Sequence, residues 1–208
     1  MTLDAQHSER SYPRFAQPTE TDHAGQPWQH DWHQVAGRLL THLDEDTTDS
    51  LPTTHSVQVG DYLDPERWER EVDVIFRSSP VVTALTAHLP EPGSYRSLEI
   101  AGVPVLTVRQ ADGGVKAFIN ACRHRGAMVV EHGCGQTRRF TCPYHAWSYD
   151  TQGTLVGISG RQKFGEIDTA TRGLTELSCE ERSGIVFAVL RPEIELDLDA
   201  WLGGYDKA

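Results

Sequence analysis

The N-terminal third of the chain contains two stretches with the periodicity of amphipathic helices. Residues 1–27 are rich in Gln, Thr, Ser, Pro and His, contain few aliphatic residues and are expected to be mobile. Between residues 28 and 43, apolar side chains recur every three or four positions, which predicts a helix with one apolar face. These positions are Trp28, Trp32, Val35, Leu39 and Leu43. The acidic, turn-forming stretch at 44–52 is typical of a linker.

A second helix is predicted from Asp61 to Phe76. It opens with Asp64-Pro65, an N-cap residue followed by proline at the first helical position. Its apolar positions form one stripe that we expect to pack against the rest of the protein: Trp68, Val72, Ile75 and Phe76. The helix should end before Pro80, because the residue preceding a proline disfavours the α conformation. Residues 28–93 are therefore predicted to form a helical flank.

After residue 93 the pattern changes to short segments rich in β-branched and aromatic residues. Ala101-Gly102, Asp112-Gly113-Gly114 and Thr151-Gln152-Gly153 are typical of hairpin turns. We expect Gly133-Cys134-Gly135 to form a turn and 160–173 a polar excursion. The predicted strands or strand pieces are Tyr95–Ile100, Val103–Arg109, Val115–Asn120, Met128–Glu131, Arg138–Thr141, Trp147–Tyr149, Thr154–Val156, Leu174–Ser178 and Ile185–Leu190.

This succession of short strands and turns predicts a mainly β fold. We expect a small antiparallel β-sandwich or barrel over residues 94–190, preceded by one or two α-helices. Residues 191–208 follow it as a tail.

Two cysteine–histidine pairs stand on predicted loops of this β region. They read Cys122-Arg123-His124 and Cys142-Pro143-Tyr144-His145. Zinc modules usually place two cysteines in one loop and two histidines in the other, whereas each loop here carries one of each. The arrangement suits a Rieske [2Fe–2S] cluster, in which one iron takes both cysteines and the other both histidines.

The candidate cofactor and metal ligands are therefore Cys122, His124, Cys142 and His145. A structural zinc site, or two buried cysteines beside two unrelated histidines, would produce the same pattern. Cys134 and Cys179 are left over and make an unconvincing disulfide pair in a reducing cytosol. No Ser-His-Asp or Cys-His nucleophile outranks the cluster, so no catalytic residue is predicted.

Charge and hydropathy exclude several classes of partner. The 208 residues carry a formal net charge of −11, which speaks against binding to nucleic acid or to an anionic membrane. The sequence has no run of eighteen apolar residues and no N-terminal signal pattern. We therefore expect a cytoplasmic protein.

Residues from about 60 to 190 resemble the N-terminal region of the α subunit of bacterial aromatic-ring-hydroxylating oxygenases. Four segments carry the resemblance: Tyr62–Glu71, Leu89–Tyr95, Ala117–Ala127 and Phe140–Tyr149. The resemblance implies an electron-entry domain whose Rieske cluster is reduced by a reductase or a small ferredoxin. The cluster then passes single electrons to a mononuclear iron that activates dioxygen. A homotrimer is also possible by analogy with the family.

Residues around the second pair favour a low reduction potential. Respiratory Rieske proteins close a disulfide over the cluster, but Tyr144 stands at one matching position and Ala127 or a neighbour at the other. Those proteins also donate hydrogen bonds to sulfur from a Ser and a Tyr hydroxyl, whereas this chain keeps Tyr149 but has Trp147 at the Ser position. Because losing a donor to sulfur lowers the potential, we expect a value near the bottom of the Rieske range of roughly −150 to +300 mV.

A local excess of positive charge surrounds the motif. Between residues 120 and 145, four arginines stand against Glu131 alone: Arg123, Arg125, Arg138 and Arg139. We expect a basic collar that favours arrival of the electron and steers an acidic donor. The alternative is that some of these arginines merely pair with nearby carboxylates.

The sequence lacks the iron-binding motif of the catalytic domain of such α subunits. The family holds its mononuclear iron with two histidines and a carboxylate, and this chain has no Asp-x2-His that is followed by a second His a few residues later. Residues 191–208 look like the link to that domain. We therefore expect an electron-transfer component, a truncated or split α subunit without a complete catalytic site, which would work with a catalytic oxygenase chain. A stand-alone Rieske ferredoxin-like carrier is the alternative.

Overall fold

The computed structural model describes residues 27–50 and 52–204, and the chain divides into two units, Met1–Thr54 and His55–Ala208. In the first unit, α1 spans Pro27–Glu45, which confirms the first predicted helix. Its apolar side chains Trp32, Leu39 and Leu43 are more than half exposed. No helix in the described part of the chain has the length and apolar character needed to cross a membrane.

The second predicted helix is present in three short pieces, α2 (Gly60–Leu63), α3 (Pro65–Glu71) and the π-helical turn η1 (Val72–Phe76). Asp64 caps α3 as expected, because its carboxylate accepts the N–H groups of Glu66 and Arg67 at 3.0 and 3.4 Å. The apolar stripe remains open: Trp68 is 60% exposed and Ile75 51%. The expected packing of this helix is therefore not seen.

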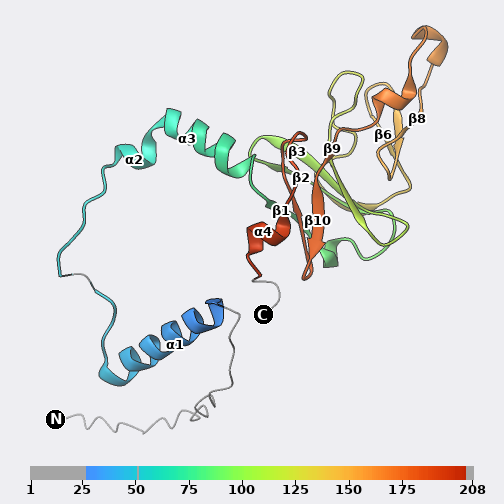
Figure 1. The fold of residues 1–208 in the computed structure, drawn as a ribbon. Helices are drawn as coiled ribbons and strands as arrows, with labels where there is room; N and C mark the ends of the chain where they lie inside the picture. Colours follow the sequence, from blue (N-terminus) through green and yellow to red (C-terminus); the bar gives the residue numbers. More distant parts are fainter. Residues whose placement is uncertain (1–26, 51, 205–208) are drawn as a thin grey trace, which may run out of the picture. The chain divides into compact units, whose positions relative to one another are not determined.

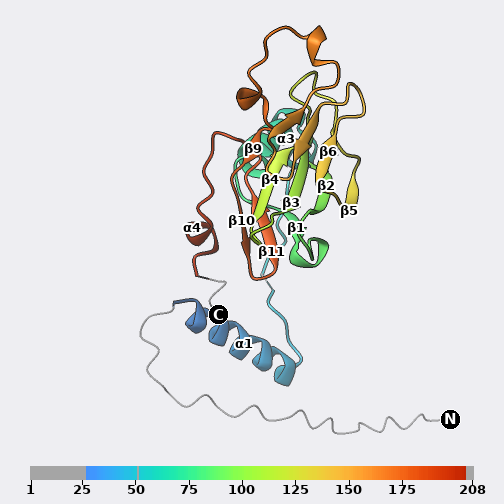
Figure 2. The same cartoon turned by 90° about the vertical axis from the view of Figure 1, so that its right-hand side faces the viewer.

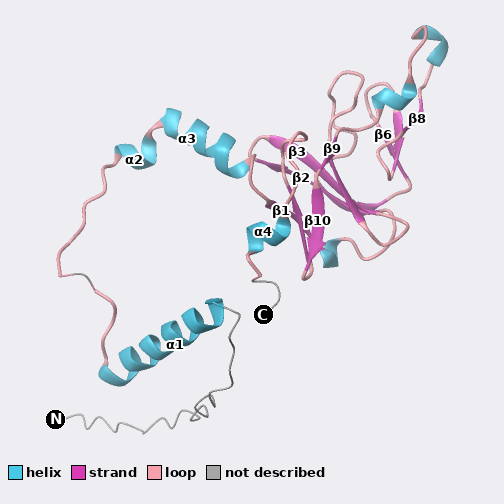
Figure 3. Cartoon of the chain, in the orientation of Figure 1, coloured by secondary structure: helices cyan, strands magenta, loops and turns pink. Residues whose placement is uncertain are grey.

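The second unit is built from antiparallel strands in three sheets, which confirms the mainly β fold (Figures 1 and 3). The five-stranded sheet has the order β5-β2-β3-β4-β9, and the two three-stranded sheets have the orders β1-β11-β10 and β6-β7-β8. The strands are β1 Val81–Leu85, β2 Ser94–Ile100, β3 Val103–Arg109, β4 Val115–Ile119, β5 Gly133–Gln136, β6 Arg139–Thr141, β7 Ser148–Asp150, β8 Leu155–Gly157, β9 Glu176–Leu177, β10 Cys179–Arg182 and β11 Ile185–Ala188.

Strand β3 separates two apolar cores. Its alternation sends Val105 into a core with Ala188 of β11, and Leu106 into a second core with Phe140 of β6 and Tyr149 of β7. All five of these side chains are at most 3% exposed. Both faces of the five-stranded sheet are therefore covered, and the β6-β7-β8 sheet packs on one of them.

One strand prediction and one turn prediction were wrong around the Gly-Cys-Gly segment. Met128–Glu131 forms no strand, whereas the predicted turn is strand β5, which pairs with β2 through Tyr95↔Gly135 and Arg96↔Cys134. Gly135 permits this pairing, because a Cβ there would lie 2.6 Å from the Tyr95 hydroxyl. The strand depends on a ring 40 positions away, which local pattern does not show.

Strands β1 and β10 were not predicted. β1 lies within the segment 28–93 expected to be helical, and it pairs with β11 from Val81↔Ala188 to Leu85↔Ile185. The flank is therefore helical only in its first part. The division into residues 1–27, 28–93, 94–190 and 191–208 otherwise stays a prediction.

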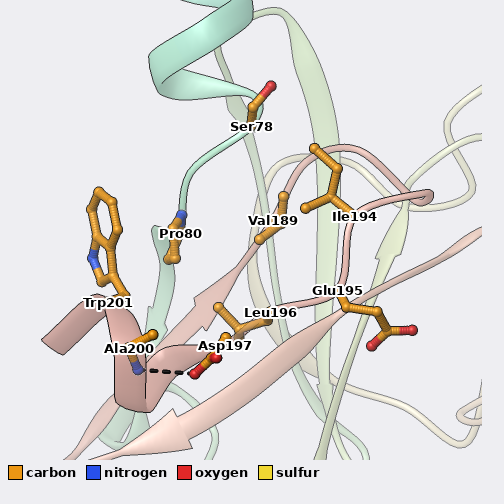
Figure 4. Close-up of a pocket in the computed structure, with 9 residues that line it drawn as sticks. All are labelled: Ser78, Pro80, Val189, Ile194, Glu195, Leu196, Asp197, Ala200 and Trp201. Atoms are coloured by element: carbon orange, nitrogen blue, oxygen red, sulfur yellow. Dashed lines mark hydrogen bonds between the residues drawn. The ribbon is translucent and has the colours of Figure 1, made fainter. Parts of the chain in front are cut away.

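The tail packs against the β unit. Short helix α4 (Leu198–Leu202) is capped by Asp197, whose carboxylate accepts the Ala200 N–H at 2.9 Å (Figure 4). Leu198 is 1% exposed, so this part of the tail buries an apolar side chain. Beside α4 lies a pocket of about 250 Å³ lined by Ser78, Pro80, Val189, Ile194, Glu195, Leu196, Asp197, Ala200 and Trp201.

Between β8 and β9 the chain leaves the sheets in a long excursion (Figures 1 and 2). It contains two 3-10 turns, η3 (Arg161–Lys163) and η4 (Thr169–Arg172), and it matches the predicted polar excursion. Its apolar residues Phe164 and Ile167 turn back onto the core beneath β6 and β7.

Candidate metal centre

The two cysteine–histidine loops share one backbone conformation. The first follows β4 and the second connects β6 to β7. In each loop the cysteine N–H donates to the carbonyl five residues later, and the N–H four residues later donates to the cysteine carbonyl. The four bonds measure 2.8–2.9 Å: Cys122 N to Ala127 O, Gly126 N to Cys122 O, Cys142 N to Trp147 O, and Ala146 N to Cys142 O.

Each loop closes through a residue with positive φ. Gly126 has φ +77° and Ala146, at the corresponding position, has φ +54°. Alanine in this left-handed region costs about 1–2 kcal/mol relative to the right-handed form. The second loop is therefore held in a conformation that alanine does not favour, as is common where a backbone shapes a binding site.

Asn120 fixes the base of the first loop. It is fully buried, and its side-chain amide donates to Ser97 Oγ at 2.9 Å and to the Val130 carbonyl at 2.7 Å. Its side-chain oxygen accepts the Val129 N–H at 3.0 Å. One residue thus ties the two ends of the loop to β2.

The two motif cysteines are buried and free. Cys122 and Cys142 are each 3% exposed. Burial raises the pKa of the Cys122 thiol, because a thiolate is poorly solvated there. A nearby cation is therefore needed to hold this sulfur as a thiolate, the form that binds metals.

Tyr149 on β7 reaches across to the first loop. Its hydroxyl lies 3.2 Å from Cys122 Sγ and accepts the Arg123 N–H at 3.0 Å. Burial, and after it the contact with Cys122, raises the pKa of Tyr149, so the hydroxyl keeps its proton. It can donate that proton to a thiolate at Cys122.

The two motif histidines lie side by side. The ring centroids of His124 and His145 are 4.7 Å apart, at an interplanar angle of 70°. Trp147 stacks on His124 at 5.0 Å and 10°, and Phe164 approaches His124 edge-on at 5.4 Å. Tyr144 covers one side of His145, with centroids 3.8 Å apart.

Both imidazoles suit a metal. Desolvation, and after it the positive charges of His145 and Arg125, lowers the pKa of His124 and so favours the neutral ring that acts as a ligand. His145 Nδ1 is buried and has no hydrogen-bond partner among the described residues. A buried ring nitrogen without a partner is unfavourable unless something else, such as a metal ion, occupies its lone pair.

The four candidate donors are two cysteines and two histidines. A zinc site needs four side chains around one ion. In the described part of the chain, no three His, Cys, Asp or Glu side chains are grouped so that they could hold one ion. A two-iron centre instead needs two thiolates and two imidazoles as separate pairs, and this donor set fits it.

Comparison with known protein families identifies the region around the two loops. Residues 79–171, which include both loops, match the family described as "Rieske [2Fe-2S] domain". The chain carries a Rieske domain. The cofactor of such a domain is the Rieske [2Fe–2S] cluster, and a structural zinc site is set aside.

Individual relatives are oxygenase subunits. The chain is 32% identical over 143 residues to the benzene 1,2-dioxygenase subunit alpha of Pseudomonas putida, covering 68% of this chain and 32% of that protein. It is 32% identical over 129 residues to the glycine betaine monooxygenase oxygenase subunit of Pseudomonas aeruginosa, covering 62% and 30%. The chain thus spans about a third of the length of these curated relatives.

A solved structure shows the same fold. Naphthalene 1,2-dioxygenase from Rhodococcus sp. superimposes with a TM-score of 0.63 at 32% identity, covering 69% of this chain and 33% of that one. The resemblance to the N-terminal region of dioxygenase α subunits is confirmed. The relatives differ in the substrate that their names state, so the likeness does not select one.

The four arginines of the predicted basic collar lie in two separate places. Arg123 and Arg125 flank His124, but β6 pairs with β7 from Arg139↔Asp150 to Thr141↔Ser148, so Arg138 and Arg139 lie at the hairpin end away from the second loop. Within the described chain none of the four arginines forms an ion pair, so they are not locally neutralised. Positive charge beside the Rieske loops therefore comes from two of the four.

The remaining cysteines lie outside the Rieske loops. Cys134 is exposed on β5, and Cys179 lies on β10, where burial raises its pKa to about 11. Asn120, Phe164 and the indole N–H of Trp147 were not predicted to belong to the site. Of these three, only Asn120 could have been found from the sequence, because it is a polar residue at the end of an apolar strand directly before the motif.

Proposed function

We propose that the chain is an electron-transfer component of a ring-hydroxylating oxygenase system, and that Cys122, His124, Cys142 and His145 hold its cluster. Cys122 and Cys142 would bind one iron, and His124 and His145 the other. The observation that carries this assignment is the pair of matching loops, which present two buried thiols and two adjacent imidazoles within one Rieske domain.

The cluster, when bound, takes up and releases one electron at a time. The surrounding residues support that role. The buried thiols and the hydrogen bond from Tyr149 bring the sulfur of Cys122 into a dry, donor-rich setting. The two histidines are half-buried, so their ring edges give an electron donor access to the centre.

The proposed donor is a reductase or a ferredoxin, and the proposed acceptor is the mononuclear iron of a catalytic oxygenase chain. The names of the relatives as dioxygenase and monooxygenase subunits support this role. Exposed Arg123 and Arg125, which have no ion-pair partner in the described chain, would favour a donor with an acidic face. A cytoplasmic location and a homotrimer are further proposals that rest on the resemblance.

The ligand assignment is tested by single substitutions in anaerobically purified protein. Cys142→Ser and His145→Ala should each abolish the Rieske absorption bands and the low-g EPR signal, because each removes a ligand atom. Iron and acid-labile sulfide should fall together, from about two of each per chain toward zero.

The chain offers matched controls for both substitutions. Cys179→Ser removes a half-buried thiol and His132→Ala an exposed imidazole, both outside the two pairs. These variants should keep the iron, the sulfide and both spectra. A ligand variant with an unchanged Rieske spectrum, or wild-type protein that contains one zinc and no sulfide, would refute the proposed function.

A further inference from the structure

Three buried side-chain polar atoms in the described chain have no hydrogen-bond partner, and two of them lie in the second Rieske loop. They are Thr107 Oγ1, His145 Nδ1 and Trp147 Nε1. Leaving a buried donor unpaired destabilises a protein, and native proteins contain few such groups. The proposed iron ligation accounts for His145 Nδ1, but not for the indole N–H.

The environment of Trp147 offers its N–H no acceptor from the described residues. The residue is 2% exposed. One face of the indole lies parallel to the His124 ring, and Phe164 meets it edge-on at 5.9 Å. Its backbone carbonyl already accepts the Cys142 N–H at 2.8 Å. The indole nitrogen is a donor only, so it needs an acceptor at this place.

Trp147 is also close to both metal-binding pairs. It stacks on one proposed histidine ligand and is hydrogen-bonded through its backbone to one proposed cysteine ligand. The indole is therefore buried beside His124, in the loop that also carries Cys142 and His145. Sulfur is the acceptor that a [2Fe–2S] centre would bring to these residues.

We propose that Trp147 Nε1–H donates a hydrogen bond to a sulfur atom of the cluster, and that Trp147 acts as a positioning and potential-setting residue. The inference rests on the proposed ligand assignment. A donor to sulfur stabilises the form with the extra electron, because that electron increases the negative charge on sulfur. Trp147 thus supplies a donor at the position where the sequence predicted that one is lost.

The decisive substitution removes the N–H and keeps the ring. Trp147→Phe removes the N–H and replaces the indole with a smaller aromatic ring. Site-specific incorporation of 3-benzothienylalanine at position 147 removes the N–H and retains the shape of the tryptophan side chain. Both should lower the midpoint potential. We expect the reduced-to-oxidised ratio at a fixed potential to fall about three- to tenfold, where tenfold corresponds to about 59 mV for a one-electron couple.

A second readout detects the proton itself. The reduced wild-type protein, transferred to D2O, should show in pulsed EPR the coupling of an exchangeable deuteron that disappears in the benzothienyl variant. Labelling tryptophan with ¹⁵N at the indole nitrogen should add a weak nitrogen coupling that is absent after Trp147→Phe. A purely structural role of the ring predicts neither loss.

Phe164→Leu is the matched control for packing. It removes the edge contacts to Trp147 and His124 and leaves the indole N–H in place. This variant should keep the exchangeable coupling, and its potential should stay nearer to wild type than that of the benzothienyl variant.

The outcomes separate this inference from the proposed function. If wild-type protein shows no Rieske spectrum, the proposed function itself fails. If wild type shows the spectrum and the benzothienyl variant keeps both the potential and the exchangeable coupling, the hydrogen bond is refuted while the ligand assignment stands. If Trp147→Phe fails to assemble the centre, the potential and the exchangeable coupling of the isosteric benzothienyl variant decide whether the hydrogen bond exists.

Discussion

Tyr149 links the two halves of the metal centre through a single hydroxyl. It stands four residues after His145 on β7, yet its hydrogen bonds go to Cys122 Sγ and the Arg123 N–H on the other loop. The side chain is fully buried, so water cannot replace either bond. The contact with Cys122 Sγ is present in the protein itself at 3.2 Å, and the hydroxyl would donate to this sulfur if Cys122 is a thiolate.

Replacing Tyr149 with Phe should therefore lower the midpoint potential and weaken the fold. The loss of a donor to Cys122 Sγ lowers the potential. The Arg123 N–H loses its partner as well, which costs about 1–3 kcal/mol of unfolding free energy. Protein-film voltammetry and urea denaturation would measure the two effects.

Tyr95→Phe is the control for Tyr149→Phe. Tyr95 packs edge-on against Phe140 with ring centroids 5.5 Å apart in the same core, but it lies on β2 and its hydroxyl forms no hydrogen bond to a motif cysteine within the described chain. Its substitution should leave the potential unchanged. An equal potential in wild type and Tyr149→Phe would show that the hydroxyl does not donate to the sulfur.

At the scale of elements, two hairpin turns were predicted from their glycines, and they are constrained differently. Gly113 in the β3–β4 turn has φ +87° and open space around its α-carbon. Gly153 in the β7–β8 turn has φ +80°, but a Cβ there would lie 2.5 Å from the ring of Phe118. The sequence predicts both turns, and only packing distinguishes them.

Gly153→Ala should therefore be more damaging than Gly113→Ala. Both substitutions place alanine at positive φ, which costs about 1–2 kcal/mol. Gly153→Ala adds an overlap with a buried aromatic ring, which costs about 1–3 kcal/mol more. Chemical denaturation of the two variants measures the difference directly, and equal losses would show that the Phe118 side of the turn is free to move.

At the scale of the whole β unit, one ion pair joins two sheets. Arg109 at the end of β3 donates to Glu181 of β10 at 2.5 and 2.8 Å, and also to the carbonyls of Leu89 and Gly113 at 2.9 and 2.8 Å. The hydrogen bond from Arg109 lowers the pKa of Glu181 to about 2. The Arg109 side chain is 9% exposed, so this pair is partly shielded from water.

This pair should make stability depend on pH in a defined direction. The pKa of Glu181 falls from 4.5 in the unfolded chain to about 2 in the folded one, so its contribution is complete above about pH 4.5 and is lost as the pH falls toward 2. At pH 7, Glu181→Gln should lower the unfolding free energy by about 1–3 kcal/mol. The difference between the two proteins should shrink as the pH is lowered from 5 toward 3.

Denaturation series over that pH range, on wild type and variant in parallel, would test the linkage. Glu176→Gln is the matched control, because Glu176 pairs with Lys116 at 2.8 Å but is 52% exposed. Its effect should stay below about 1 kcal/mol at every pH, as for other exposed pairs. A constant gap between wild type and Glu181→Gln from pH 7 to pH 3 would contradict the assigned pKa.

The sequence by itself determined what depends on neighbours along the chain. The cap at Asp64, the hairpins at Gly113 and Gly153, and the spacing of the two Cys–His pairs are local features, because a turn or a metal loop closes within a few residues. For that reason the β class and the Rieske domain were predictable without coordinates.

Only the tertiary structure decided what depends on residues far apart. Strand β1 forms because Val81 meets Ala188, and β5 forms because Gly135 leaves room for Tyr95. The hairpin register places Arg138 and Arg139 away from the second loop. The unpaired N–H of Trp147 is likewise a property of its surroundings, because burial and the lack of an acceptor are set by every element packed around it rather than by the residue type.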